Sequence, residues 1–234
     1  MIDIHSHILP NVDDGSESLS ESLELVKEAI KLGISDIVLT PHFEVTPARM
    51  IPGVNIKEQF DLFCEEIKKE NLQVNLYLGN EVKNDDNLLE ILKVRKDLSL
   101  NNSKYLLLEL DFYSLDLDIG EYIYELSLLG YHVIIAHVER YIYTNYKYVE
   151  LLVNEGALIQ VNANALVSKD SEMKKMIFKL IKNNKVHFIS SDVHYGRENK
   201  MLEAYQVVAK KFNKDIANKL FIENPRKVLL NQDL

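Results

Sequence analysis

Histidines and carboxylates recur along this chain in short motifs that directly follow apolar runs. The first motif is His5-Ser6-His7, which comes after the apolar residues Ile2 and Ile4. Side chains two positions apart on a strand point to the same face, so His5 and His7 together form a pincer suited to a metal ion. Later motifs supply further donors: His42, Glu81, Glu109, His137, Asp192 and His194. The recurrence indicates a metal-dependent enzyme.

The chemistry of these donors narrows the choice of metal. Imidazoles and carboxylates without a thiolate favour zinc, iron or manganese over a structural zinc bound by cysteines. The donors exceed the needs of one ion, so they suit two or three ions that share a bridging carboxylate. Asp13 and Asp14 add a carboxylate beside the first pincer, and the sequence leaves open which of them binds.

Any one of these donors could also be an ordinary loop histidine or rim carboxylate. His132 and His187 fall at the starts of expected strands, away from the other motifs. Functional groups of parallel α/β folds gather at the opposite, C-terminal ends of the strands. We therefore assign structural roles to these two histidines.

Two arginines point to a phosphorylated ligand. Arg140 lies three residues after His137, and Arg197 lies three residues after His194. A guanidinium group can bind two phosphate oxygens at once, so we expect both arginines to contact a phosphate. A surface salt bridge is the commoner fate of any single arginine. Cys64 lacks the arginine spacing of a cysteine-dependent phosphatase, and the chain has no Walker loop.

Bulk composition excludes several classes of protein. The chain has 234 residues, 47% of them hydrophobic, which suits one sizeable domain over residues 1–234. A formal net charge of −9 argues against nucleic acid as a partner, although bound metals would concentrate positive charge locally. No apolar run approaches the roughly 20 residues of a membrane span, and no secretory signal is visible. The single cysteine fits a reducing cytoplasm.

Apolar strands alternate with amphipathic helices along the chain. Expected strands lie at 2–4, 34–40, 74–78, 105–110, 133–136, 158–161 and 186–190, and expected helices at 17–32, 56–70, 87–92, 119–129, 148–154, 172–183, 199–212 and 215–220. This alternation predicts a parallel sheet covered by helices. About seven such units favour an α/β fold of the distorted (β/α)7 type, a TIM-like barrel. Exposed acids on the first helix could support a homo-oligomer, although a solvated face is the default.

A series of motifs spans essentially the whole chain in order. They are Met-Ile-Asp-Ile-His-Ser-His-Ile at the start, Val-Asp-Asp-Gly-Ser at 12–16, Thr-Pro-His at 40–42, Gly-Asn-Glu at 79–81, Ala-His-Val-Glu-Arg-Tyr at 136–141, Gln-Val-Asn at 160–162, Ser-Asp-Val-His at 191–194 and Asn-Pro-Arg-Lys at 224–227. Together they resemble the PHP family, the polymerase and histidinol phosphatase metal-dependent phosphoesterases. The closer resemblance is to the bacterial capsule-type manganese-dependent tyrosine phosphatases. The opening motif and His-Val-Glu-Arg-Tyr are the specific ones.

The resemblance implies a PHP fold that binds divalent ions, with Mn²⁺ expected and iron or zinc as alternatives. Carried over residue by residue, it implies three sets of metal ligands: His5, His7, Glu81 and Asp192; Glu81, His42 and His137, with Glu81 bridging; and Asp14, Glu109 and His194. Arg140 and Arg197 would bind the phosphate. His42 or His194 could act as general acid if its ring is not fixed on a metal.

The implied reaction is hydrolysis of phosphotyrosine on a bacterial tyrosine kinase that regulates capsular or exopolysaccharide synthesis. We expect no covalent phosphoenzyme, because no nucleophilic side chain is placed in the expected site. The rival functions are a histidinol-phosphate phosphatase or other PHP phosphoesterase, a nuclease, which the net charge disfavours, and a non-enzymatic metal-binding module that docks the kinase. Residues 43–54 depart from the resemblance, because Arg49 is their only basic residue where many relatives carry a basic or His/Asn-rich loop.

Overall fold

The computed structural model describes residues 1–114 and 118–234, and its strands are short and parallel. They are β1 (Ile2–Asp3), β2 (Asp36–Leu39), β3 (His42–Phe43), β4 (Asn75–Leu78), β5 (Glu81–Lys83), β6 (Tyr105–Glu109), β7 (His132–Ile135), β8 (Leu158–Asn162) and β9 (Phe188–Ser190). One sheet has the order β1-β2-β4, and the other has the order β3-β5-β6-β7-β8-β9.

The two sheets are parts of one curled ring. β2 pairs with β4 up to Leu39 and Leu78, and β3 pairs with β5 from His42 and Glu81 with the same offset. Pro41 interrupts this shared ladder because it has no amide hydrogen to donate. At the other edge, the Asp192 amide donates to the His5 carbonyl at 2.9 Å, which joins the end of β9 to the end of β1. The predicted distorted seven-unit barrel is therefore confirmed.

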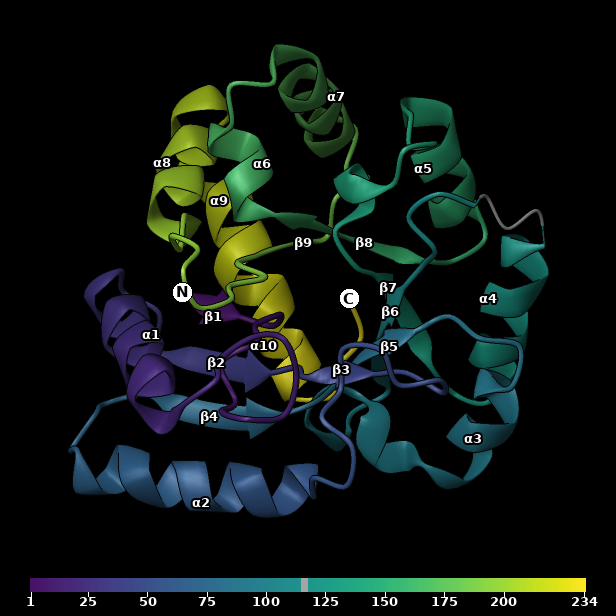
Figure 1. The fold of residues 1–234 in the computed structure, drawn as a ribbon. Helices are drawn as coiled ribbons and strands as arrows, with labels where there is room; N and C mark the ends of the chain where they lie inside the picture. The colour runs from purple at the N-terminus through teal and green to yellow at the C-terminus, as the bar shows by residue number, and fades with distance from the viewer. Residues whose placement is uncertain (115–117) are drawn as a thin grey trace.

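Helices surround the ring, and one of them crosses its middle (Figure 1). They are α1 (Leu19–Lys31), α2 (Ile56–Lys69), α3 (Leu88–Val94), α4 (Ile119–Leu128), α5 (Tyr146–Asn154), α6 (Ala163–Val167), α7 (Ser171–Lys182), α8 (Met201–Lys211), α9 (Lys214–Asn218) and α10 (Asn224–Leu229). Short turns of other helix types lie between them: η1 (Lys96–Leu98), η2 (Leu100–Asn102), η3 (Val138–Arg140) and the π-helical η4 (Lys219–Glu223). None of the helices in the described residues is both long and apolar enough to traverse a bilayer.

Helix ends differ from their predicted positions where side chains cap them. The helix expected at 17–32 begins at Leu19, because the Ser18 hydroxyl accepts the Glu21 amide at 3.3 Å. The final helix expected at 215–220 falls on α9 and the first two residues of η4, and the helical chain continues beyond it through η4 into α10. Sequence periodicity missed α10 because its main buried residues, Asn224, Pro225 and Val228, make no helical apolar stripe.

Apolar residues form two layers, one on each side of the strands. Outward-facing residues such as Ile37, Leu106 and Ile135 pack under the helices. Inward-facing residues fill the barrel: Ile2, Ile4, Val38, Leu107, Ile134 and Phe188, with Val228 of α10 packed among them. In Figure 1, α10 crosses the middle of the ring. The interior is therefore a solid apolar floor beneath the carboxyl ends of the strands.

Candidate metal centre

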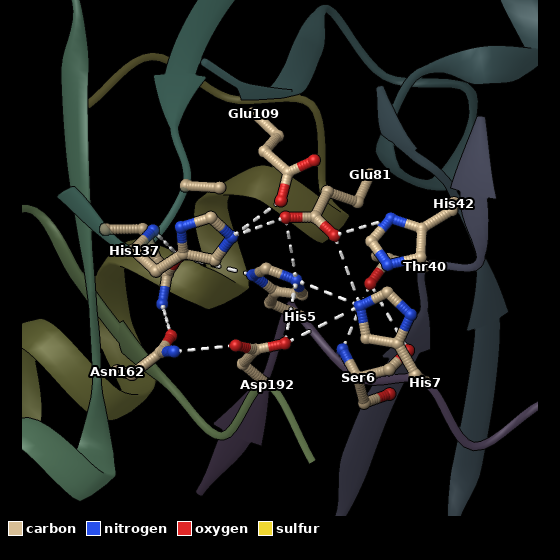
Figure 2. A network of polar contacts seen from close by, with 12 residues as sticks. His5, Ser6, His7, Thr40, His42, Glu81, Glu109, His137, Asn162 and Asp192 are labelled. Carbon is tan, nitrogen blue, oxygen red and sulfur yellow. Dashed lines mark hydrogen bonds and ion pairs between the residues drawn. The ribbon is translucent and has the colours of Figure 1, made fainter. Parts of the chain in front are cut away.

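The predicted donors gather at the carboxyl ends of the strands. His5 and His7 follow β1, His42 opens β3, Glu81 opens β5 and Glu109 closes β6. His137 follows β7, and Asp192 and His194 follow β9. Figure 2 shows the imidazoles and carboxylates of most of these residues pointing toward one another. His132 and His187 lie at the amino ends of β7 and β9, which confirms their assignment outside this group.

The first donor group surrounds His5 and His7. His5 Nε2 lies 3.3 Å from His7 Nε2, 3.4 Å from Glu81 Oε1 and 3.5 Å from Asp192 Oδ1. His7 Nε2 lies 3.3 Å from Glu81 Oε2. Atoms bound to one ion at about 2.1 Å are about 3.0–3.4 Å apart in octahedral or tetrahedral geometry. His5, His7 and Glu81 are therefore spaced to share one cation, and Asp192 lies beside the two imidazoles.

Glu81 also centres a second group. Its Oε2 lies 2.9 Å from His42 Nδ1, and its Oε1 lies 2.7 Å from His137 Nε2. Oε1 of Glu109 lies 3.5 Å from the same His137 nitrogen. Both carboxylate oxygens of Glu81 thus face imidazoles of two groups, which is the position that a bridging ligand requires.

The third group brings Asp14 together with His42 and His194. Asp14 Oδ1 lies 3.3 Å from His42 Nε2 and 3.6 Å from His194 Nε2. Glu109 does not lie in this group, which differs from the expected distribution. The reason is topological: β6, which carries Glu109, pairs with β5 and β7, whereas Asp14 and His194 follow β1 and β9 across the barrel.

Residues behind the donors orient them. Asp13 Oδ2 lies 2.7 Å from His7 Nδ1 and also accepts the His42 amide at 3.0 Å, so Asp13 supports the donors while Asp14 faces them. Gln160 Oε1 lies 3.2 Å from His5 Nδ1 and accepts the His137 amide at 2.6 Å. Such partners fix the ring orientation of metal-binding histidines. The Gln-Val-Asn motif was the sequence signal for Gln160, but periodicity alone gave it no role.

Local backbone geometry aims several donors inward. His137 and Asp192 have φ angles of 28° and 51°, in a region that non-glycine residues seldom adopt. Such conformations concentrate at functional sites, where the surrounding structure enforces them. Gly15 is needed for close approach, because a Cβ there would lie 2.1 Å from the His7 carbonyl oxygen.

The buried carboxylates and imidazoles shift one another's pKa values. Burial favours the neutral form of Glu81, but His5 and His137 outweigh it and hold the pKa of Glu81 well below its usual range. Burial likewise opposes charge on His137, yet Glu81 and Glu109 raise the pKa of that imidazole to about 10. Without another cation, these carboxylates therefore keep a proton on His137.

The residues present fit divalent ions. The donors are imidazole nitrogens and carboxylate oxygens, and all but Asp14 are at least nine-tenths buried. Glu81 Oε2 and Asp192 Oδ1 are buried and accept no hydrogen bond of normal geometry from the described residues. Both atoms face imidazole nitrogens instead, as expected where lone pairs converge on an ion. Three sets have donor atoms close enough to share an ion: His5, His7 and Glu81; His42, Glu81 and Glu109; and His7, Asp14, His42 and His194.

Arginine side chains border the donors. Arg140 Nη1 donates to Asp192 Oδ2 at 3.0 Å, and its guanidinium lies 4.8 Å from the centre of the Phe112 ring. Arg197 Nη1 lies 3.3 Å from His194 Nδ1. Both predicted arginines thus reach the donors. The sequence reasoning missed that Arg49 also does so, through Glu109, and the only signal was its isolation as a basic residue in its loop.

Comparison with known proteins identifies the family to which the chain belongs. The family model for the capsular polysaccharide synthesis proteins CpsB/CapC matches residues 1–230. The chain belongs to this family. It is 33% identical over 246 residues to the tyrosine-protein phosphatase CpsB of Streptococcus agalactiae, with 99% of both chains covered.

Solved structures give the same result for the fold. One match comes from the crystal structures of YwqE from Bacillus subtilis and CpsB from Streptococcus pneumoniae, described as unique metal-dependent tyrosine phosphatases. It has a TM-score of 0.92 at 32% identity and covers 100% of this chain and 96% of that chain. Histidinol phosphate phosphatase from Lactococcus lactis has a TM-score of 0.57 at 15% identity, covering 94% of both chains, which shows a shared fold alone. The resemblance drawn from the motifs is confirmed.

Proposed function

We propose that this chain is a metal-dependent phosphatase that hydrolyses phosphotyrosine, acting as one domain over residues 1–234. The observation that carries the proposal is the set of three connected donor groups, two of which share Glu81, with Arg140 and Arg197 at their edge. A cation cluster bordered by guanidinium groups suits a dianionic phosphate ester. The named activity of relatives at 33% and 32% identity supports the choice of tyrosine as the alcohol.

Bound divalent ions would neutralise phosphate oxygens and lower the pKa of the attacking water. The chain's own part is to hold the substrate. The guanidinium N–H groups of Arg140 and Arg197 lie near the metal ligands. There they can bind the phosphate oxygens and stabilise the negative charge that develops on those oxygens. A cation–π contact with the Phe112 ring restrains the position of the Arg140 guanidinium.

Proton transfer to the leaving group is assigned to His42 or His194. Tyrosinate has a pKa of about 10, so it leaves with little assistance. Both ring nitrogens of His42 face carboxylates, of Glu81 and Asp14. His194 turns Nδ1 toward the Asp192 carbonyl at 3.1 Å, which leaves Nε2 facing the site. The Nε2 atom of His194 lies 3.6 Å from Asp14 Oδ1. His194 is therefore the better placed of the two as long as this nitrogen is not bound to a metal ion.

The physiological substrate that we propose is a phosphotyrosine-bearing bacterial tyrosine kinase of capsular or exopolysaccharide synthesis, and the proposed ion is Mn²⁺. The family's role in capsular polysaccharide synthesis supports the kinase. Imidazole and carboxylate donors suit manganese, iron and zinc, and the large carboxylate share favours manganese. A cytoplasmic location accords with the single cysteine.

The test is phosphate release from a phosphotyrosine peptide and from histidinol phosphate, measured side by side with Mn²⁺ and with a chelator. The proposal expects release from the peptide that chelation abolishes and Mn²⁺ restores. Faster release from histidinol phosphate would reassign the substrate and leave the metal centre intact. Metal binding without turnover of either substrate would contradict an enzymatic role.

A further inference from the structure

The loop between β3 and α2 is organised around one buried carboxylate. The side chain of Glu44 is only 2% exposed. Its Oε2 accepts the amides of Ala48 at 2.7 Å and Arg49 at 2.9 Å, which closes residues 44–49 into a turn. Although burial opposes ionisation, these hydrogen bonds lower the pKa of Glu44. The turn therefore has a fixed, charged centre.

Arg49 extends from this turn to the donor groups. Its Nε donates to Glu44 Oε1 at 2.7 Å, while its Nη1 donates to Glu109 Oε1 at 3.0 Å. A second terminal nitrogen also contacts Glu109. The Arg49 side chain is 24% exposed, so it lies at the mouth of the site rather than within the core. Glu44 thus holds one edge of the guanidinium and leaves the other edge facing the donors.

Arg49 and Arg140 occupy equivalent positions on different sides of the centre. Arg140 donates to Asp192, and Arg49 donates to Glu109. Figure 2 shows these two carboxylates on opposite sides of His5. Each arginine is also held from behind, Arg140 by the Phe112 ring and Arg49 by a carboxylate. Guanidinium groups fixed in this way lose little conformational entropy when they bind an anion.

We propose that Arg49 is a third phosphate-binding arginine, positioned by Glu44, which contacts the phosphoryl oxygens of the substrate. The inference rests on the proposed function. A divalent ion held by Glu109 would neutralise part of its negative charge and so would weaken the Arg49–Glu109 pair. The terminal nitrogens of Arg49 then face the centre while Nε stays on Glu44. Arg49 is a binding residue in this arrangement, and Glu44 is a positioning residue.

Phosphate affinity gives a direct readout that does not depend on turnover. Inorganic phosphate is titrated calorimetrically into the Mn²⁺-loaded protein and its variants. Loss of a charge-assisted contact in Arg49→Gln should weaken phosphate binding about tenfold or more. Arg49→Lys should recover only part of the affinity, because an ammonium group cannot replace the fork held by Glu44. Glu44→Gln should give an intermediate loss.

Kinetics and metal titration complete the test. In Arg49→Gln, the KM for a phosphotyrosine peptide should rise with the phosphate dissociation constant. Mn²⁺ titration of the metal-free variant should show affinity that is equal to or tighter than that of the unaltered chain, because a competitor for Glu109 is gone. Arg226→Gln, an exposed arginine on α10, is the matched control and should change none of these quantities.

Two results would overturn the proposal. One is unchanged phosphate affinity and unchanged KM in a folded Arg49→Gln variant of an otherwise active chain. The other is a parallel loss of Mn²⁺ affinity, which would make Arg49 a support of the donor groups rather than a ligand of phosphate. Failure of the proposed function would look different, because the unaltered chain itself would then release no phosphate from the peptide.

Discussion

The two ends of this barrel bury very different side chains in the same set of strands. At the carboxyl ends, His5, Glu81 and Asp192 are buried in a polar cluster. At the amino ends, Val228 of α10 packs against Ile2 and other apolar residues of the interior. Burial of ionisable groups is tolerated only where opposite charges or a metal compensate them, whereas apolar burial is favourable by itself. One end therefore stabilises the fold, and the other is available for chemistry.

Two histidines, one at each end of the barrel, differ in pKa for the same reason. Glu81 and Glu109 overcome burial and raise the pKa of His137 to about 10. His187, at the amino end, faces Lys219 and Lys185 instead, and burial together with these cations lowers its pKa to about 4. Its Nδ1 accepts the Ile159 amide at 2.9 Å, which requires the neutral ring. The same residue type is thus charged at one end of the barrel and neutral at the other.

The largest effect should come from removing the bridging carboxylate. Glu81→Gln takes one shared ligand from two donor groups, so we expect the rate of phosphate release to fall about 10³-fold or more. Metal content should fall with it. Phosphate release and metal analysis of the purified variant check this, with exposed Glu121→Gln on α4 as control. Near-normal release by a metal-poor Glu81→Gln would show that the polar end is not the active site.

A smaller loss should follow from disturbing the support of the donors. Gln160→Leu removes the contacts that orient His5 and His137, without removing a donor atom. Loss of such a contact costs about 10–100-fold in metal affinity. Mn²⁺ titration measures the change, and Gln206→Leu on the exposed side of α8 serves as control. An unaltered Mn²⁺ affinity would mean that the barrel positions these rings without Gln160.

The two ends of the barrel should give different pH dependences, one of Mn²⁺ affinity and the other of folding stability. At the polar end, a divalent ion must displace the proton from His137, so Mn²⁺ affinity should rise with pH by up to about tenfold per unit below about pH 10. At the other end, the folded chain favours neutral His187. The stability that His187 contributes is therefore present above its ordinary pKa of 6.5 and lost as pH falls through about 4.

Metal titrations at pH 6, 7 and 8 measure how Mn²⁺ affinity changes with pH. Unfolding of the metal-free protein between pH 4 and 7 measures the stability that depends on His187. His187→Gln should abolish a stability loss on the order of 2–3 kcal/mol over the acidic range. It should leave the pH dependence of Mn²⁺ binding unchanged. A metal affinity that is flat with pH would contradict the proton displacement at His137.

The smallest effect on catalysis is expected at the apolar end. Val228→Ala leaves a small cavity in the barrel floor and should lower the free energy of unfolding by about 2 kcal/mol. Activity per folded molecule should stay within about twofold, because no donor moves with Val228. Thermal unfolding compares this variant with Val94→Ala, whose side chain is 79% exposed. A large loss of activity at full stability would show that the two ends are coupled.

Local sequence patterns predicted the architecture and most members of the polar cluster. Apolar runs alternating with amphipathic stripes are local patterns, and they predicted a parallel barrel. Chemistry-bearing residues directly after such runs must meet, because the carboxyl ends of parallel strands share one rim. For that reason His5, Glu81 and His137 could be assigned to one site before any distance was known.

Which residues share a donor group depends on how distant segments of the chain pack together. Glu109 lies beside His137 because β6 and β7 pair, and strand neighbours are set by long-range packing rather than by spacing along the chain. The support from Gln160 and the reach of Arg49 also depend on how separate segments approach each other. The same is true of Val228, whose helix fills the barrel floor only because the ring leaves room for it. Local patterns carry no record of such contacts.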